Sequence, residues 1–224
     1  MNITMPVVLS SNGYALVFDD FAPAKLTLSN PLTYTTEGKA PISYYFVNGN
    51  GSLEGTVRRL SELTGRQELP PLWSLGYITS KYGYKTQHET DSVVSRLKRG
   101  GYPLDGVVLD LYWYGKEQDM GRLSWDPEQW PDHKKMLAGL KKKGVNTIII
   151  HQPYILRNGR ALDNYNLLKE SGMMVMDSVL SGPQEVKIWV GEGGMFDVSN
   201  PSTREWMASR LKELTDEGVG GWWG

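Results

Sequence analysis

Hydrophobic residues in the first fifty positions of the chain fall into short runs separated by turn residues. The runs lie at residues 7–9, 14–18, 25–29 and 42–47, and they are rich in β-branched and aromatic side chains. Such runs are typical of β-strands, and their close spacing favours a sandwich over strand–helix–strand units. Four strands are too few to complete a sandwich, so we expect only part of one.

A helical pattern follows these strands. Apolar residues recur at helical spacing from Leu53 to Leu63, which places them on one face of a helix. Ser52 can cap the start of this helix, and Gly65 can end it. Residues 1–66 are therefore expected to form the C-terminal part of a β-sandwich plus a linker helix.

From residue 67 onwards the pattern changes to strands that alternate with helices. The four predicted buried strands lie at residues 72–79, 106–111, 146–150 and 219–223. Helices are predicted to open at Thr86, Pro131 and Asn200, and each is followed by a glycine. This alternation predicts a parallel sheet with right-handed crossovers, whose strands are covered on both faces. Residues from about 160 to 197 are predicted to form an excursion with a short helix and a hairpin.

Charge and composition narrow the possible classes of function. The chain has 224 residues with 24 basic and 25 acidic side chains, so its formal net charge of -1 excludes a generally basic nucleic-acid surface. No segment approaches the ~20 apolar residues of a transmembrane helix, and the first ten residues lack the features of a signal peptide. We therefore expect no nucleic-acid or membrane partner, and both the cytoplasm and the periplasm remain open as compartments.

The chain contains no cysteine and only three histidines. This excludes disulfides and thiolate chemistry and leaves little room for a histidine-rich metal site. By contrast, tryptophan and tyrosine are abundant, at 8 and 12 residues against 4 phenylalanines. Amphipathic rings of this kind predict a site where flat polar ligands are stacked and hydrogen-bonded.

Candidate ligand contacts follow the predicted strands at their carboxyl ends, where α/β folds place ligand sites. Asp110 ends an apolar strand, where a carboxylate is costly unless it is paired, so it either binds sugar hydroxyls or a cation, or serves as a helix cap or salt-bridge partner. His151 follows the next strand, as a ligand contact or as a structural residue. Trp113 and Trp189 are either stacking platforms for a sugar or core residues. No metal-ligand spacing and no phosphate-binding or nucleophile-elbow motif is present.

The segments that carry these residues resemble glycoside hydrolase family 31, the α-glucosidase and α-xylosidase family. The similar segments are LTGRQELPPLWSLGY, GYPLDGVVLDLYWY, LSWDPEQWPDHKKMLAGLKKKGV, IIIHQPYI and IWVGEGGMFDVSNPSTREWM. The resemblance implies an α/β fold with a partial N-terminal β-sandwich, followed over residues 67–224 by the first half of a (β/α)8 TIM barrel. It also implies a retaining α-glycosidase, which uses two carboxyl groups about 5–5.5 Å apart and no cofactor.

The resemblance also implies substrate contacts. Asp110 matches the family's sugar-binding aspartate, Leu111 and Ile150 match apolar wall positions, and Trp189 matches a sugar-contacting tryptophan. With the candidates from the residue pattern, the expected substrate-binding set is Asp110, Leu111, Trp113, Ile150, His151 and Trp189.

Two positions depart from the family pattern. The family often has a second aspartate where this chain has Tyr112, and an Asp-Pro pair where it has Gln152-Pro153. These departures favour His151 or Gln152 as polar contacts. They also leave the choice between glucose and xylose open.

Neither catalytic carboxyl group can be assigned to a residue of this sequence. On the family pattern, the nucleophile is expected immediately after Gly224 and the acid/base further on. We therefore expect a fragment of a retaining α-glycosidase that hydrolyses terminal α-linked glucose or xylose from oligosaccharides, inactive by itself. The alternative is a non-catalytic carbohydrate-binding or structural remnant. Either would leave open sheet edges near Trp73 and Trp222, which favour a homo-oligomer.

Overall fold

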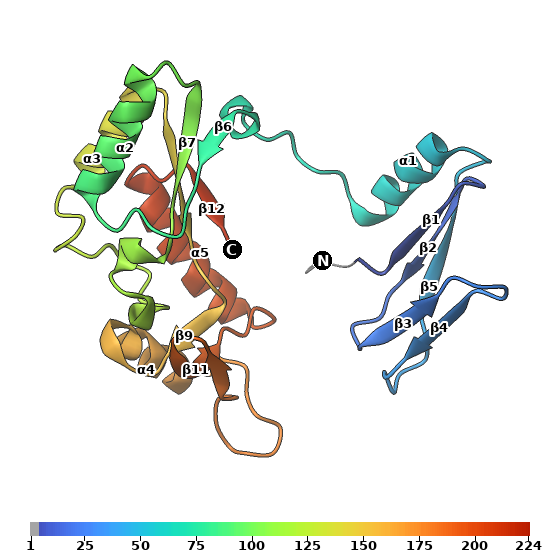
Figure 1. The fold of residues 1–224 in the computed structure, drawn as a ribbon. Helices are drawn as coiled ribbons and strands as arrows, with labels where there is room; N and C mark the ends of the chain where they lie inside the picture. Colours follow the sequence, from blue (N-terminus) through green and yellow to red (C-terminus); the bar gives the residue numbers. More distant parts are fainter. Residues whose placement is uncertain (1–4) are drawn as a thin grey trace. The chain divides into compact units, whose positions relative to one another are not determined.

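The computed structural model describes residues 5–224, which divide into two compact units (Figure 1). One unit ends at Leu69 and the other covers Pro70–Gly224. The boundary falls at the Pro70-Pro71 pair, where no helix can continue. Each unit has its own sheets and helices and is described by itself.

The N-terminal unit contains two small antiparallel sheets. The first has the order β1-β2-β5 and the second pairs β3 with β4, and the bounds are β1 (Val7–Ser10), β2 (Tyr14–Phe18), β3 (Ala24–Thr27), β4 (Thr33–Thr36) and β5 (Tyr44–Asn48). The two sheets meet where the Phe18 ring stacks on the Tyr34 ring, with centroids 4.0 Å apart. Strand β4 is absent from the sequence prediction because it alternates threonine with a single tyrosine and has no aliphatic residue to mark it.

The predicted helix of this unit is confirmed as α1 (Leu53–Thr64). Ser52 caps it as expected, because its hydroxyl accepts a hydrogen bond from the Gly55 amide at 3.0 Å. Gly65 follows the last turn with a φ of 90°, a conformation that favours glycine.

The C-terminal unit is built on a four-stranded parallel sheet. Its strands are β6 (Tyr77–Thr79), β7 (Leu104–Leu109), β8 (Asn146–Ile150) and β12 (Gly221–Trp223), in the order β12-β8-β7-β6. The four strands lie side by side in the order in which they occur along the chain, and every pairing is parallel. This is the order of successive strands in a (β/α)8 barrel, so the expected α/β fold with a partial barrel is confirmed.

Helices connect the parallel strands, and two of the three begin with the side-chain cap that the sequence predicts, whereas the helix predicted to open at Pro131 begins at His133 without a side-chain cap. The connecting helices are α2 (Gln87–Arg99), α3 (His133–Lys142) and α5 (Pro201–Asp216). Thr86 accepts from the Glu89 amide at 3.0 Å, and Asn200 accepts from the Ser202 amide at 2.9 Å. The Glu89 carboxylate in turn accepts from the amide of Lys85, the residue before this cap, at 2.8 Å.

An excursion separates β8 from α5 (Figure 1). It contains β9 (Tyr154–Leu156), α4 (Leu162–Glu170), β10 (Val186–Ile188) and β11 (Gly191–Met195), with the antiparallel order β10-β11-β9. Strand β11 lies so close to β9 that a Cβ atom at Gly193 would be 1.9 Å from the Ile155 carbonyl oxygen. One hairpin joins β10 to β11, and an antiparallel bridge between Met176 and Pro183 closes a second turn, where the Asp177 amide donates to the Gly182 carbonyl at 2.9 Å.

The first predicted strand of the C-terminal unit is shorter than expected. The sequence predicts a buried strand over residues 72–79, but Leu72–Leu75 forms a 3₁₀ turn, η1, and only Tyr77–Thr79 is strand. The Ser74 amide bonds to the Pro71 carbonyl at 2.9 Å, which turns the chain before it reaches the sheet. The two leucines of η1 are 85% and 70% exposed, so the prediction of a buried strand is wrong for this half.

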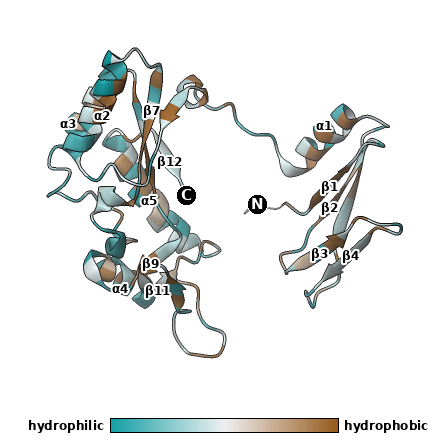
Figure 2. Ribbon diagram, in the orientation of Figure 1, coloured by the Kyte–Doolittle hydropathy of each residue, from teal (hydrophilic) through white to brown (hydrophobic). Residues whose placement is uncertain are grey.

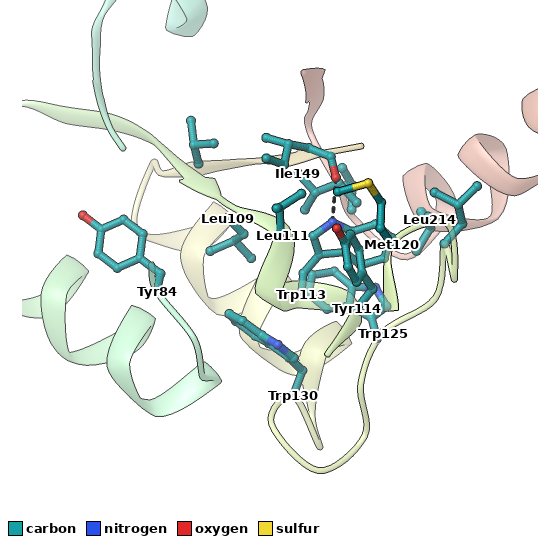
Figure 3. Packing of buried hydrophobic residues seen from close by; sticks show 14 of the residues in the cluster. Tyr84, Leu109, Leu111, Trp113, Tyr114, Met120, Trp125, Trp130, Ile149 and Leu214 are labelled. Atoms are coloured by element: carbon teal, nitrogen blue, oxygen red, sulfur yellow. Dashed lines mark hydrogen bonds between the residues drawn. The ribbon is translucent and has the colours of Figure 1, made fainter. Parts of the chain in front are cut away.

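Strand β7 lies at the centre of the hydrophobic core of the C-terminal unit. All of its residues except Asp105 are buried, and Figure 2 shows this strand as predominantly hydrophobic. Trp113, Trp125 and Trp130, from the loop after β7, belong to the same core (Figure 3). The core therefore supports the carboxyl end of β7, where the candidate site begins.

Candidate functional site

A pocket of about 440 Å³ lies at the carboxyl ends of the parallel strands. Its lining residues are Ser80, Lys81, Tyr82, Asp110, Leu111, Ile150, His151, Gln152, Trp189, Trp223 and Gly224. They come from the segments after β6, β7 and β8, from the end of β12, and from the turn between β10 and β11. All the expected substrate-binding residues except Trp113 lie in this lining.

Asp110 stands where β7 gives way to the short helix η2 (Leu111–Tyr114). Its Oδ1 accepts a hydrogen bond from the Leu111 amide at 2.7 Å, so one oxygen serves as a helix cap. None of the hydrogen bonds between described residues engages Oδ2, which leaves that oxygen available in the pocket. Burial raises the pKa of Asp110, the Leu111 amide opposes this rise, and the Glu117 carboxylate adds to it. The free oxygen can accept hydrogen bonds from ligand hydroxyls.

His151 follows β8, and its ring lies in the pocket wall. The His151 backbone amide donates to the Trp223 carbonyl at 3.0 Å, which extends the pairing of β8 with β12. Burial lowers the pKa of His151, and the contact with the Gln152 backbone opposes this, so the ring is neutral at pH 7. Its Nδ1 atom is buried and has no hydrogen-bond partner in the part of the chain that the structure describes.

Apolar side chains from two strand ends form the floor of the pocket. Leu111 and Ile150 are both buried, and both line the pocket. They belong to neighbouring segments because β7 and β8 pair in parallel up to Leu109 and Ile149.

Trp113 does not reach the pocket, and its prediction as a sugar-stacking platform is wrong. The indole is 0% exposed and packs edge-on against Tyr114 and Trp125 (Figure 3). Its Nε1 donates to the Ile150 carbonyl at 2.8 Å. The turn of η2 directs this side chain into the core, so Trp113 supports the pocket wall at Ile150 from behind.

Trp189 is the most exposed tryptophan of the site, at 60%. It lies on the turn between β10 and β11 and lines the pocket. It also lines a second cavity of about 520 Å³, together with Arg157, Asn158, Lys187, Ile188, Gly191 and Glu192. An exposed indole that lines two cavities is suited to stack against flat, partly apolar ligands.

Glu117 lies outside the pocket lining but contacts Trp189. The sequence pattern does not indicate Glu117 as a site residue. Its Oε2 accepts from Trp189 Nε1 at 3.3 Å, and its Oε1 accepts from the Tyr112 hydroxyl at 2.7 Å. Tyr82 packs edge-on against Tyr112 with centroids 5.9 Å apart, and the Lys85 ammonium lies 4.5 Å from the Tyr112 ring centroid. The Tyr112 and Tyr82 hydroxyls lower the pKa of Glu117, while Glu117 raises the pKa of both tyrosines. No sequence motif contains this cluster, because Glu117 and Trp189 are 72 positions apart.

Residues 5–224 contain no group of three or more histidine, aspartate or glutamate side chains placed to hold a metal ion. Over the same range, none of the helices combines the length and the apolar character that a membrane span requires.

A ligand pocket at the carboxyl ends of parallel strands in sequence order defines a barrel-type α/β domain. The glycosyl hydrolases family 31 TIM-barrel domain matches this chain over residues 67–224. The chain therefore belongs to glycoside hydrolase family 31, and the resemblance stated from the sequence is confirmed.

Relatives and solved structures agree with this assignment. The chain is 32% identical over 184 residues to an alpha-glucosidase of Saccharolobus solfataricus, covering 81% of this chain and 25% of the relative. It is 28% identical over 226 residues to an alpha-xylosidase of Lactiplantibacillus pentosus, covering 96% of this chain and 28% of the relative. A solved xylosidase from Aspergillus niger superposes with a TM-score of 0.81 at 26% identity, over 99% of this chain and 30% of that one. A solved dextranase of the same family from Flavobacterium johnsoniae, in complex with isomaltotriose, superposes with a TM-score of 0.89. It is 20% identical over 98% of this chain and 27% of that one, so it supports the fold alone.

The chain thus spans between 25% and 30% of the length of these relatives.

Proposed function

We propose that the pocket binds a terminal α-linked glucose or xylose unit and serves a retaining α-glycosidase that acts on oligosaccharides. The observation that carries the proposal is Asp110, a half-buried carboxylate at the carboxyl end of the second barrel strand with one oxygen available in the pocket. The relatives named above as alpha-glucosidase and alpha-xylosidase support the sugar class.

The lining of the pocket suits a sugar ring in three respects. Asp110 Oδ2 and the His151 ring, which lines the pocket, offer hydrogen-bonding groups to ligand hydroxyls. Leu111 and Ile150 offer an apolar surface to the C–H groups of the ring, and Trp189 offers a face for stacking. Because Trp189 also lines a second cavity, that cavity could hold a further unit of an oligosaccharide.

We further propose that the polypeptide of 224 residues binds its sugar without hydrolysing it. Retaining hydrolysis needs two carboxyl groups about 5–5.5 Å apart. Among the described residues that line the pocket, Asp110 carries the only side-chain carboxyl group. The same observation favours the second candidate function, a non-catalytic carbohydrate-binding module.

Binding is tested by titrating the purified chain with methyl α-D-glucopyranoside and methyl α-D-xylopyranoside, followed by ligand-observed NMR. Asp110→Asn keeps the size of the side chain but removes its charge, and loss of a charge-assisted hydrogen bond is expected to weaken binding about tenfold or more. Asp163→Asn, an exposed carboxylate on α4, is the matched control and should leave binding unchanged. Equal affinity of Asp110→Asn and the unmodified chain would show that this carboxylate does not bind the sugar.

Turnover of an aryl α-glucoside by the pure chain would refute the proposed lack of hydrolysis.

We also propose that the polypeptide self-associates through the edges of its parallel sheet. Within the sheet, β6 and β12 each pair with a neighbouring strand on one side only. Unpaired strand edges favour association with another chain. Light scattering should show particles larger than a monomer, and a monodisperse monomer would contradict the proposal.

A further inference from the structure

We propose that Glu117 is a positioning residue that fixes the Trp189 indole as the aromatic wall of the pocket. This inference rests on the proposed function of the pocket as a sugar site. The two oxygens of the Glu117 carboxylate bind different partners, Tyr112 at 2.7 Å and Trp189 at 3.3 Å. Glu117 is absent from the pocket lining, whereas Trp189 is part of it, so Glu117 would act on a ligand through the residues it contacts and not directly.

The backbone that carries Glu117 is more firmly anchored than the turn that carries Trp189. Glu117 opens the short helix η3 (Glu117–Asp119), whose last residue is 5% exposed. Asp119 accepts from the Lys116 amide at 3.1 Å and from the Arg160 amide at 3.0 Å, which joins η3 to the segment after β9. Trp189, in contrast, stands on a hairpin turn with most of its surface exposed. The bond to Glu117 is therefore a main restraint on the orientation of the indole.

Tyr112 fixes the carboxylate from the other side. Its hydroxyl donates to Oε1, and its ring is packed between Tyr82 and the Lys85 ammonium. Tyr82 itself lines the pocket. Glu117 thus connects three segments of the chain, those after β6 and β7 and the turn between β10 and β11.

Substitution of Glu117 by glutamine and by alanine distinguishes the effect of its two hydrogen bonds from the effect of its charge. A glutamine oxygen can accept from the Trp189 indole, and its amide can donate to the Tyr112 hydroxyl, so Glu117→Gln keeps both contacts without the charge. Glu117→Ala removes both contacts. If Glu117 acts by position, the glutamine variant behaves as the unmodified chain and the alanine variant does not.

The first measurement needs no sugar. The full chain is labelled with fluorotryptophan, and the Trp189 signal in the fluorine NMR spectrum is assigned as the one lost in Trp189→Phe. Glu117→Ala is expected to shift and narrow this signal and to increase its quenching by acrylamide, because the indole is released. Glu117→Gln should restore the original signal, and Glu170→Ala, an exposed glutamate on α4, should leave it unchanged. If Glu117→Ala fails to fold by circular dichroism, Glu117→Asp takes its place, since the shorter side chain withdraws the carboxylate from Trp189 but keeps its charge.

The second measurement is the affinity for methyl α-D-glucopyranoside and methyl α-D-xylopyranoside. Glu117→Ala should weaken binding about fivefold, and Glu117→Gln should stay within about twofold of the unmodified chain. An unchanged Trp189 signal in both Glu117→Ala and Glu117→Asp would overturn the positioning role. So would a glutamine variant that behaves like the alanine variant. If the unmodified chain binds neither sugar while the Trp189 signal responds as expected, the proposed function fails and the positioning of Trp189 stands.

Discussion

Trp113→Phe tests whether the buried indole behind the pocket wall acts through its hydrogen bond. Trp113 is fully buried, and its Nε1 donates to the Ile150 carbonyl at 2.8 Å. Phenylalanine keeps an aromatic ring in the core but removes the N–H group. The Ile150 carbonyl then loses its side-chain donor, and the smaller ring leaves a cavity beside it.

The expected cost follows from these two changes. A buried polar group that loses its partner costs about 1–3 kcal/mol. The volume lost between indole and phenyl adds on the order of 1 kcal/mol, at about 24 cal/mol per Å³ of cavity. The free energy of unfolding should therefore fall by about 2–4 kcal/mol.

Trp125→Phe separates the two contributions. Trp125 is also buried, lies 5.4 Å from Trp113 between ring centroids, and has a buried Nε1 without a hydrogen-bond partner among the described residues. Its replacement creates a similar cavity without the loss of a hydrogen bond. We expect a cost of about 1 kcal/mol or less, and the difference between the two variants measures the bond to Ile150.

Tryptophan fluorescence during urea unfolding is the appropriate assay. All 8 tryptophans lie between residues 73 and 223, so their fluorescence reports on the C-terminal unit and not on the N-terminal one. With an m-value of about 2 kcal/mol/M, Trp113→Phe should lower the urea midpoint by roughly 1–2 M without changing the slope. An equal loss in Trp113→Phe and Trp125→Phe would refute the reasoning, because the hydrogen bond would then contribute nothing.

Three further predictions concern the surroundings of the pocket. Arg160→Ala removes the closer arginine partner of the buried Asp126 carboxylate, at 2.6 Å, and leaves Arg122 at 3.6 Å. Because Arg160 is partly exposed, we expect the free energy of unfolding in the same urea assay to fall by about 1–3 kcal/mol, whereas an unchanged midpoint would mean that this ion pair does not contribute to stability. His151 has a folded-state pKa below its ordinary value of 6.5, so the stability it contributes is present above pH 6.5 and is lost as the pH falls through the folded-state pKa. His151→Gln should therefore lose less stability than the unmodified chain between pH 8 and pH 5 in thermal melts, and parallel curves would contradict this. Gly193→Ala places a Cβ atom 1.9 Å from the Ile155 carbonyl oxygen, so hydrogen exchange should accelerate in β9 and β11, and unaltered protection there would show that the strands can separate without cost.

The hydrophobic pattern of the sequence predicts some of the parallel strands better than others. Strand β7 could be predicted because nearly all of its residues are buried, and a strand covered on both faces is a continuous apolar run. The segment 72–79 is similarly apolar, yet half of it forms a turn with exposed leucines. That outcome depends on the Pro71 carbonyl, which accepts from the Ser74 amide, and hydrophobicity carries no information about such a local bond.

The site could be predicted where a residue's place in a strand determines its role. Asp110 and His151 follow parallel strands, so the sheet itself brings them to one pocket. Trp113 and Trp189 could not be told apart in the same way, because one enters the core through the turn of η2 and the other stands exposed on a hairpin. Glu117 could not be predicted at all, since its role comes from a contact across 72 positions.

The departure at Tyr112 has a physical consequence for Asp110. An aspartate at this position, as the family often has, would put a second negative charge two residues from Asp110, and a like charge at short range raises the pKa of a carboxyl group. In this chain Tyr112 carries no charge, and its hydroxyl donates to Glu117. The negative charge near Asp110 is therefore that of Glu117, whose own pKa is lowered by the tyrosine hydroxyls that donate to it. The Glu117 charge raises the pKa of Asp110, but burial raises it more. Tyr112 thus places a partner of Glu117, and through it a support for Trp189, at the position where the family often has a second carboxylate.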